Sequence, residues 1–209
     1  MRRTDGLGQI IVLNGVPRAG KSSIAEVLME RFDEPCMNLG VDHFNNHITA
    51  KKYSPGIGLR PGGERPDLEP WIVRFYAALY ESIAAHSRQG LHVVTDIDHH
   101  DDYSEPRGIL CDCARRLQGL PALLVGVRCP IDTVWERRRN TWLKGQDIPP
   151  DTPPPEILYK WEQAVHTPGI YDLQVDTSSL SPEQSATAIL DHLRDGPEPT
   201  AFRRLAQIR

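Results

Sequence analysis

The sequence contains no apolar run that approaches the roughly 20 residues needed to span a membrane. Its first residues, Met1-Arg2-Arg3, lead into Thr-Asp-Gly and not into the apolar segment of a secretory signal peptide. An excess of basic residues is also missing, because the formal net charge is −4. These absences argue against a membrane protein and against one whose main task is to grip a nucleic-acid backbone. We therefore expect a cytoplasmic protein.

Cysteine is scarce as well, with only four residues among 209. Cys36, Cys111, Cys113 and Cys129 are too few and too irregularly spaced for a disulfide scaffold. The Cys111-Asp-Cys113 segment lacks a second ligand pair at the spacing of a zinc site. We interpret all four as free thiols and regard a metal site as the less favoured alternative.

The most informative feature is the phosphate-binding pattern Gly-Val-Pro-Arg-Ala-Gly-Lys-Ser at residues 15–22, which directly follows the apolar run 10–13. Such a loop places backbone N–H groups and a helix N-terminus around phosphate oxygens. We expect Lys21 to reach the β- and γ-phosphates and the Ser22 hydroxyl to ligate Mg²⁺. The expected nucleotide contacts are Gly15, Val16, Pro17, Arg18, Ala19, Gly20, Lys21, Ser22 and Ser23.

Short apolar runs alternate with longer helical stretches, which is the pattern of a parallel sheet covered by helices. We predict an α/β fold with a five-stranded parallel sheet flanked by helices. The expected strands lie near 9–14, 36–41, 91–95, 121–128 and 172–176. The expected helices span about 21–32, 69–88, 104–117, 131–143, 155–164 and 181–193.

Two segments rich in proline and glycine interrupt this alternation. Residues 54–70 predict an ordered loop or a mobile flap. Residues 145–155 follow the basic cluster Arg137-Arg138-Arg139, and a basic helix that runs into a proline-rich connector is typical of a lid that closes over a nucleotide. We place the lid at about 136–160.

The segment after residue 195 looks peripheral. We expect a single P-loop kinase domain over residues 1–195 and a C-terminal tail over 196–209, with a short helix at 201–208. No internal repeat is visible.

Two carboxylates are candidates for chemistry at the phosphate loop. Asp42 follows the second expected strand, which we expect to neighbour the loop-bearing strand, so it can accept the proton of an attacking hydroxyl group. A helix cap before His43-Phe44 is the competing interpretation, and Phe44 is a further candidate for contact with the acceptor. Asp96 ends the apolar run 93–95, as in a Walker B segment, and is a candidate for holding Mg²⁺ and for lining the acceptor site. A plain loop residue is the alternative.

Polar and basic clusters complete the candidate site. In the segment Asp98-His99-His100-Asp101-Asp102, neighbouring residues seldom converge on one ion. We therefore favour a polar wall of the acceptor pocket, with Asp98 as its candidate residue, over a transition-metal site. Consecutive helical side chains point about 100° apart, so one or two of Arg137, Arg138 and Arg139 should face phosphate oxygens.

Together these motifs resemble the chloramphenicol phosphotransferase-like family of P-loop kinases, from about residue 9 to residue 193. The resemblance rests on the phosphate loop, Gly40-Val41-Asp42, Val125-Gly-Val-Arg-Cys129, Arg137 with Arg139, and the segment His166-Thr-Pro-Gly-Ile-Tyr-Asp-Leu-Gln-Val-Asp-Thr177. It implies a domain like that of the nucleoside monophosphate kinases with a helical lid. The implied reaction moves the γ-phosphoryl group of ATP to a hydroxyl group of a small natural product.

The resemblance also implies roles for single residues. Asp42 occupies the position of the catalytic base, Lys21 and Ser22 occupy the phosphate and magnesium positions, and Arg137 that of the lid arginine. The segment Asp176-Thr177 falls where the family lodges adenine.

The sequence departs from the family in two places. After Arg139, a candidate nucleotide contact, the family commonly continues with an Arg-Gly-Asp-Arg-like stretch, whereas residues 140–145 read Asn-Thr-Trp-Leu-Lys-Gly. Lys144 is a candidate for the second lid cation. The third expected strand continues into Ile97-Asp98-His99-His100. This acidic, histidine-bearing rim suits an acceptor more polar than chloramphenicol, such as a basic or a sugar-bearing compound.

We predict an ATP- and Mg²⁺-dependent phosphotransferase acting on a hydroxyl-bearing antibiotic, either chloramphenicol-like or more polar, in resistance or self-protection. A nucleotide switch or ATPase without an acceptor, and a kinase of an RNA or protein hydroxyl, are the alternatives. A regulatory GTPase is disfavoured, because Asn-Lys-x-Asp is missing and no Asp-x-x-Gly follows the phosphate loop. A homo-oligomer is compatible with the sequence.

Overall fold

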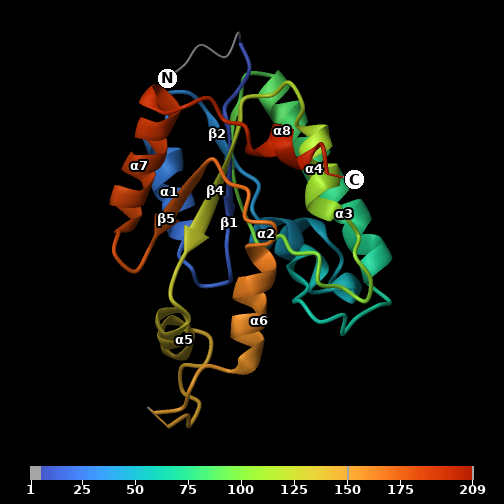
Figure 1. Cartoon of the computed structure of the whole chain (residues 1–209), viewed down its shortest axis with the longest axis vertical. Helices are drawn as coiled ribbons and strands as arrows, with labels where there is room; N and C mark the ends of the chain where they lie inside the picture. The colour runs from blue at the N-terminus through green and yellow to red at the C-terminus, as the bar shows by residue number, and fades with distance from the viewer. Residues whose placement is uncertain (1–5, 150, 209) are drawn as a thin grey trace.

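Five parallel strands form the centre of the molecule in the order β2-β3-β1-β4-β5 (Figure 1). The computed structural model describes residues 6–149 and 151–208. The strands are β1 (Ile10–Asn14), β2 (Cys36–Asn38), β3 (His92–Ile97), β4 (Ala122–Arg128) and β5 (Leu173–Asp176). The predicted α/β fold with a five-stranded parallel sheet is confirmed.

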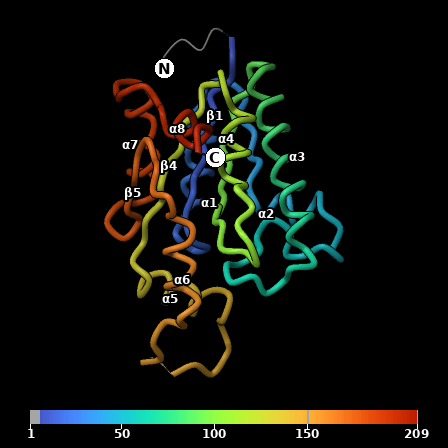
Figure 2. The backbone as a smooth tube through the Cα atoms, turned by 45° about the vertical axis from the view of Figure 1, so that its right-hand side comes forward, coloured from blue at the N-terminus to red at the C-terminus, as the bar shows by residue number. Residues whose placement is uncertain are grey.

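The central strand β1 is fully buried and divides the core into two layers. Side chains alternate between the two faces of a strand, so Ile10 and Val12 point to one layer, whereas Ile11 and Leu13 point to the other. Helices α3, α4 and α8 cover the first face, and α1 and α7 cover the second (Figure 1). Helices α5 and α6 extend beyond one edge of the sheet (Figure 2).

The predicted helices are all present, with ends that differ by a few residues. They are α1 (Lys21–Arg31), α3 (Glu69–Arg88), α4 (Ile109–Arg116), α5 (Ile131–Asn140), α6 (Glu156–Val165), α7 (Pro182–Asp195) and α8 (Ala201–Leu205). The short helix α2 (Val41–His43) was not among the predicted helices. Three further helical turns lie at Phe44–Ile48, Lys51–Tyr53 and Gly56–Gly58. None of the helices in the described part of the chain is both long enough and apolar enough to cross a lipid bilayer.

The second strand is shorter than expected, and its position in the sheet differs. It stops at Asn38, whose side-chain oxygen accepts a hydrogen bond from the N–H of Gly40 at 2.9 Å and turns the chain into α2. Asp42 therefore lies in a helical turn and not at a strand end. β3 separates β2 from β1, so the expectation that β2 neighbours the loop-bearing strand was wrong.

β3 is longer than expected and pairs with β1 up to Ile97. Asp96 is thus a residue of the strand itself. The helix expected from residue 104 begins only at Ile109, because the carboxylate of Asp101 accepts hydrogen bonds from the N–H groups of Arg107 and Gly108 and fixes a loop there.

The proline- and glycine-rich segment 54–70 forms a loop that packs under α3. Ile57 and Leu59 are buried, and the hydroxyl of Tyr76 donates to the carbonyl of Ile57 at 3.0 Å. These contacts hold the loop against the core beside α2.

The C-terminal segment is part of the core, so the expectation of a peripheral tail was wrong. Ala201, Phe202 and Leu205 on α8 are buried against α4 and β4. The carboxylate of Asp172 accepts hydrogen bonds from the N–H groups of Thr200 and Ala201 and so fixes the first turn of α8.

Asn14, the last residue of β1, connects three separate segments at the end of the sheet. Its amide nitrogen donates to the carbonyl of Val165 at 2.8 Å and contacts the hydroxyl of Tyr171 at 3.0 Å. Its amide oxygen accepts from the N–H of His99 at 2.9 Å. Asn14 thereby anchors α6 and the loop after β3 to the phosphate-loop strand.

Replacing this buried amide should destabilise the protein. We expect Asn14→Leu to lower the free energy of unfolding by about 2–4 kcal/mol, because the N–H of His99 loses its buried partner and the carbonyl of Val165 keeps only the Tyr171 hydroxyl. Urea unfolding followed by circular dichroism measures the change. The same substitution at the exposed Asn140 is the control, and equal stability of the two variants would contradict the anchoring role.

Candidate active site

A cavity of about 670 Å³ opens at the carboxyl edge of the sheet. This volume lies within the range of about 300–1,000 Å³ found for small-molecule sites. The lining comes from the phosphate loop, α2 and the turns after it, the end of β3, and the α5–α6 region. The lining residues used below are Arg18, Gly20, Lys21, Ser22, Val41, Asp42, Asn45, Pro55, Asp96, Ile97, Asp98, Arg137, Trp142, Trp161 and Thr177.

The phosphate loop has the backbone of an anion-binding nest. Arg18 has a φ of 74° and Gly20 a φ of 96°, both in the left-handed region. Alternation of right- and left-handed residues turns successive N–H groups toward one point. Gly20 is also the residue before α1, so the positive end of the helix dipole points at the same space. Both features favour a phosphate group at this position.

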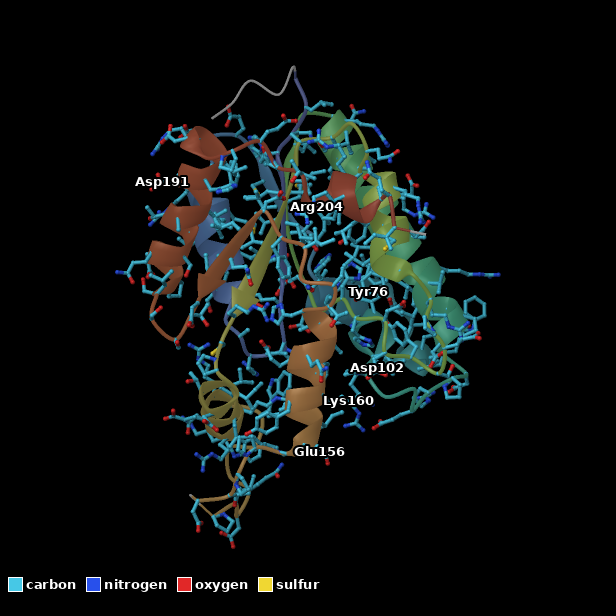
Figure 3. All side chains as sticks on the ribbon, in the orientation of Figure 1. Tyr76, Asp102, Glu156, Lys160, Asp191 and Arg204 are labelled. Atoms are coloured by element: carbon cyan, nitrogen blue, oxygen red, sulfur yellow. The ribbon has the colours of Figure 1, made fainter. Side chains whose placement is uncertain are left out.

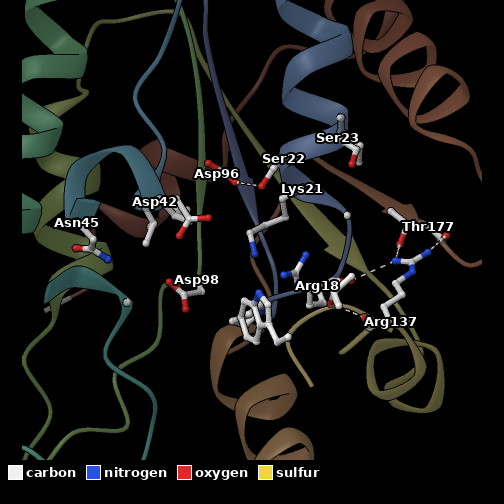
Figure 4. A pocket seen from close by; sticks show the side chains of 18 of the residues that line it. Arg18, Lys21, Ser22, Ser23, Asp42, Asn45, Asp96, Asp98, Arg137 and Thr177 are labelled. Carbon is white, nitrogen blue, oxygen red and sulfur yellow. Dashed lines mark hydrogen bonds between the residues drawn. The ribbon is translucent and has the colours of Figure 1, made fainter. Parts of the chain in front are cut away.

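Lys21 begins α1, and its side chain is folded against the loop. Its ammonium nitrogen donates to the carbonyl oxygens of Gly15 at 2.6 Å and Val16 at 3.0 Å. Burial lowers the pKa of Lys21, and the nearby carboxylates of Asp98, Asp96 and Asp42 act in the opposite direction. The amine is therefore a buried donor that faces several carboxylates across the cavity (Figure 4).

Ser22 and Asp96 form the pair expected for a magnesium site. The Ser22 hydroxyl donates to Oδ2 of Asp96 at 2.6 Å, which is the dashed bond between them in Figure 4. Gly40 makes room for this carboxylate, because a Cβ at that position would lie 1.8 Å from Oδ1 of Asp96. A hydroxyl and a carboxylate next to the phosphate loop suit a hard cation such as Mg²⁺.

Asp42 and Asp98 stand on the side of the cavity opposite the phosphate loop. Asp42 lies in the first turn of α2 and lines the cavity with Asn45, three residues later. Asp98 follows β3 and is 5% exposed. Burial raises the pKa of Asp98 to about 6, while Lys21 acts to lower it. Figure 4 shows Asp42, Asn45 and Asp98 together on this side.

Arg137 connects helix α5 to the phosphate loop and to the segment after β5. Its guanidinium group donates to Thr177 at the side-chain oxygen and the carbonyl, at 3.1 and 2.8 Å, and to the carbonyl of Arg18 at 3.3 Å. The hydroxyl of Thr177 donates to the carbonyl of Ala19 at 2.6 Å. Among the three consecutive arginines, Arg137 is thus the one that lines the cavity.

Arginine and tryptophan side chains stack on one another between the phosphate loop, α5 and α6. The guanidinium carbon of Arg18 lies 4.4 Å from the ring centre of Trp142, and that of Arg138 lies 4.9 Å from the same ring. Arg138 also lies 5.7 Å from the ring of Trp161 on α6. Cation–π contacts therefore link the phosphate loop to both lid helices.

Helix α6 also contacts the loop after β3. Lys160 on α6 forms an ion pair with Asp102 at 3.2 Å, and Figure 3 shows the two side chains facing each other. Asp102 belongs to the loop after β3, four residues beyond Asp98. The loop that carries Asp98 is thus held in place at both of its sides, by Asn14 and by Lys160.

Several predicted site residues lie outside the cavity. The guanidinium group of Arg139 lies 5.9 Å from the ring of Trp135, Asp176 bonds Ser178, and Phe44 packs in the core. Lys144 is exposed on the connector after α5 and does not line the cavity. Their proposed contacts with nucleotide or acceptor stay predictions.

The two histidines after Asp98 do not form the rim that the sequence suggested. His99 stacks on Tyr76 with ring centres 4.3 Å apart and shares a hydrogen bond with the Tyr80 hydroxyl at 2.9 Å. Burial lowers the pKa of His99 to about 3, so the ring is neutral. His100 bonds the carbonyl of Leu59. Within this segment, the cavity lining includes Asp98 but neither histidine.

Comparison with known proteins identifies the family. The model of the chloramphenicol phosphotransferase-like proteins matches residues 8–194. The chain belongs to this family. It is also 23% identical over 217 aligned positions to a Mycobacterium tuberculosis H37Rv protein named "Putative O-phosphotransferase Rv2636", which covers 95% of this chain and 88% of the relative.

Solved structures with the same fold include a kinase and a resistance protein. The Mycobacterium tuberculosis APS kinase CysC, in complex with AMPPNP and APS, has a TM-score of 0.59 at 16% identity and covers 90% of this chain and 99% of its own. The tunicamycin resistance protein of Deinococcus radiodurans has a TM-score of 0.57 at 17% identity, and the match covers 89% of this chain and 95% of that protein. At these identities the likeness concerns the fold.

Family and fold together identify the protein as an O-phosphotransferase, an enzyme that binds a nucleotide and a small-molecule acceptor. Sequence reasoning missed Asn45, Trp142 and Trp161 as lining residues. The one sequence feature that could have indicated these residues is the tryptophan close to the basic cluster at 137–139. No motif predicts Trp161 or Asn45, because tertiary packing places them at the cavity.

The stack around Trp142 should contribute to nucleotide binding. We expect Trp142→Ala to raise the KM for ATP about five- to ten-fold with a smaller change in kcat, because two cation–π contacts at the lid are lost. Steady-state kinetics or binding of a fluorescent ATP analogue measures this. Trp71→Ala is the matched control, since Trp71 is exposed outside the cavity and lies beside Arg74 at 5.2 Å. Equal effects at the two positions would contradict the role of the stack.

Proposed function

We propose that the protein transfers the γ-phosphoryl group of ATP, in the presence of Mg²⁺, to a hydroxyl group of a small natural product. The observation that carries this proposal is the position of Asp42. Its carboxylate lines the same cavity as the phosphate loop, on the opposite side, and is close enough to Lys21 to influence the pKa of that amine. An acceptor bound between the two would have a base on one side and the phosphate on the other.

In this mechanism the acceptor oxygen attacks the γ-phosphorus while Asp42 accepts its proton. The bond between the γ-phosphorus and the β,γ-bridging oxygen breaks, and ADP leaves with that electron pair. Lys21 exchanges its hydrogen bonds to the Gly15 and Val16 carbonyls for phosphate oxygens. Arg137, already oriented by Thr177, adds positive charge from the lid side.

Ser22 and Asp96 are the residues that would hold Mg²⁺. A bound Mg²⁺ supplies positive charge that stabilises the phosphoryl oxygens during transfer. Asp96 would keep the Ser22 hydroxyl oriented, as their 2.6 Å hydrogen bond does now.

An antibiotic is the proposed acceptor, and resistance or self-protection is the proposed role. The family description names chloramphenicol, and one structural neighbour is a tunicamycin resistance protein. Both support a hydroxyl-bearing natural product in general and do not favour one compound. The cavity volume also suits a small molecule better than an RNA or a protein surface.

Removing the proposed base should abolish transfer and leave nucleotide binding nearly intact. We expect Asp42→Asn to lower the rate at least about 100-fold, because the amide cannot accept the hydroxyl proton, with ATP affinity within about two-fold of the original. The measurement is mass spectrometry of reactions with Mg²⁺-ATP and a panel of hydroxyl-bearing antibiotics and nucleosides that includes chloramphenicol.

Asp191→Asn, on the exposed face of α7, is the control for this experiment. A parallel loss of ATP binding in Asp42→Asn would remove Asp42 from the role of base. ATP hydrolysis without any phosphorylated compound, across the whole panel, would instead favour an ATPase or a nucleotide switch.

The proposed metal pair gives an independent test. We expect Ser22→Ala to raise the Mg²⁺ concentration for half-maximal activity about ten-fold, because one of two oxygen ligands is lost. Ser82→Ala, on α3 and away from the cavity, should leave the Mg²⁺ dependence unchanged. An unchanged Mg²⁺ dependence in Ser22→Ala would show that Ser22 does not hold the metal.

A further inference from the structure

Charge is divided sharply between the two sides of the cavity. The cationic lining side chains in the described chain, Arg18, Lys21 and Arg137, come from the phosphate loop and the lid helix α5. The side formed by α2, the turns after it and the end of β3 carries Asp42, Asn45 and Asp98 and has no cationic lining residue among those described. Figure 4 shows this separation directly. We call the second group of residues the acidic side.

Asp98 on the acidic side has a carboxylate oxygen that lacks a hydrogen-bond donor among the described residues. Its side chain lines the cavity, is 5% exposed, and has an oxygen, Oδ1, for which no partner exists among the described residues. Buried carboxylate oxygens are almost always paired, because an unpaired one loses its hydration without a compensating hydrogen bond. A ligand bound against the acidic side could provide the missing donor.

The surroundings of Asp98 specify the kind of donor. Lys21 is the cation that acts most strongly on Asp98, but it belongs to the phosphate loop on the other side of the cavity. Asp42 and Asp96 add negative charge near Asp98, so a group that brings another negative charge to the acidic side would be repelled. A hydroxyl or an ammonium group would instead donate to Asp98, and an ammonium group would gain charge attraction as well. Val41 and Pro55 offer apolar surface for the carbon skeleton.

We propose that Asp98 is a specificity-determining residue that accepts a hydrogen bond from a hydroxyl or ammonium group of the acceptor, so that the enzyme takes neutral or cationic polyhydroxylated acceptors and rejects anionic ones. The proposal rests on the proposed function only in treating the acidic side as the place where the acceptor binds. It is distinct from proton abstraction, which we assign to Asp42.

A matched set of sugars tests the charge preference by binding alone. D-glucosamine, D-glucose and D-glucuronate share one hydroxylated ring and differ in charge at about neutral pH. Their affinities for the protein saturated with Mg²⁺ and a non-hydrolysable ATP analogue can be measured by ligand-observed NMR, with chloramphenicol as a larger neutral compound. We expect glucosamine to bind at least as well as glucose, and glucuronate about ten-fold more weakly.

Asp98→Asn isolates the contribution of the charge, since it keeps the shape of the side chain. We expect it to lower the affinity for glucosamine about ten-fold or more and to reduce the preference for glucosamine over glucose. Asp191→Asn on α7 is the matched control, because Asp191 is exposed and does not line the cavity. Should Asp98→Asn fail to fold, the order of the three sugars on the unmodified protein still decides the matter.

Several results would overturn the proposal. These are glucuronate binding as well as glucose, an unchanged glucosamine preference in folded Asp98→Asn, no binding of any compound in the set, or an effect of Asp98→Asn on Mg²⁺ requirement alone. Phosphorylation of the bound compounds is scored separately by mass spectrometry. Binding in the expected order without phosphorylation would uphold the role of Asp98 and contradict the proposed function.

Discussion

The buried ammonium group of Lys21 is the interaction on which the arrangement of the site depends. Taking a cation out of water is costly, and burial indeed lowers the pKa of this residue. The carbonyls of Gly15 and Val16 provide hydrogen bonds, and the facing carboxylates of Asp42, Asp96 and Asp98 provide opposite charge. The carboxylates depend on Lys21 in turn, because without its positive charge they would share one cavity with little to offset their mutual repulsion.

The order of the strands explains how those carboxylates come together. β3 lies between β1, which leads into the phosphate loop, and β2, which leads into α2. Asp96 and Asp98 are two residues apart, and side chains at that spacing on an extended segment share a face. Ile97 and His99 therefore point the other way, into the core formed with Tyr76 and Tyr80. The same alternation that builds the acidic side removes the histidine from it.

The sequence was sufficient for the parts of the site that depend on local patterns. The phosphate loop, the central strands and the positions of the helices follow from glycine placement and apolar periodicity, and the structure has them where expected. Ser22 and Asp96 were paired from their motifs, and they are hydrogen-bonded.

Features set by tertiary packing could not be predicted in this way. The sequence treated His99 and His100 as polar rim residues, because a single chain does not show that Tyr80 and Leu59 supply buried partners. The early end of β2 depended on one hydrogen bond that the Gly40 N–H donates to the side-chain oxygen of Asn38. The choice of Arg137 among three arginines depended on Thr177, 40 residues later.

The stack of Arg18, Trp142 and Arg138 couples the phosphate loop to α5 and the segment that follows it. Arg18 is held in the left-handed region by the loop, so its side chain leaves the loop in a fixed direction toward the Trp142 ring. Trp142 itself is half exposed, and each cation–π contact at such a site is worth only about 0.5–1 kcal/mol. Arg137 adds stronger hydrogen bonds from α5 to the phosphate loop and to Thr177. The phosphate loop is therefore joined to this region by contacts of unequal strength, and the hydrogen bonds of Arg137 contribute more to holding α5 in place than the half-exposed ring of Trp142 does.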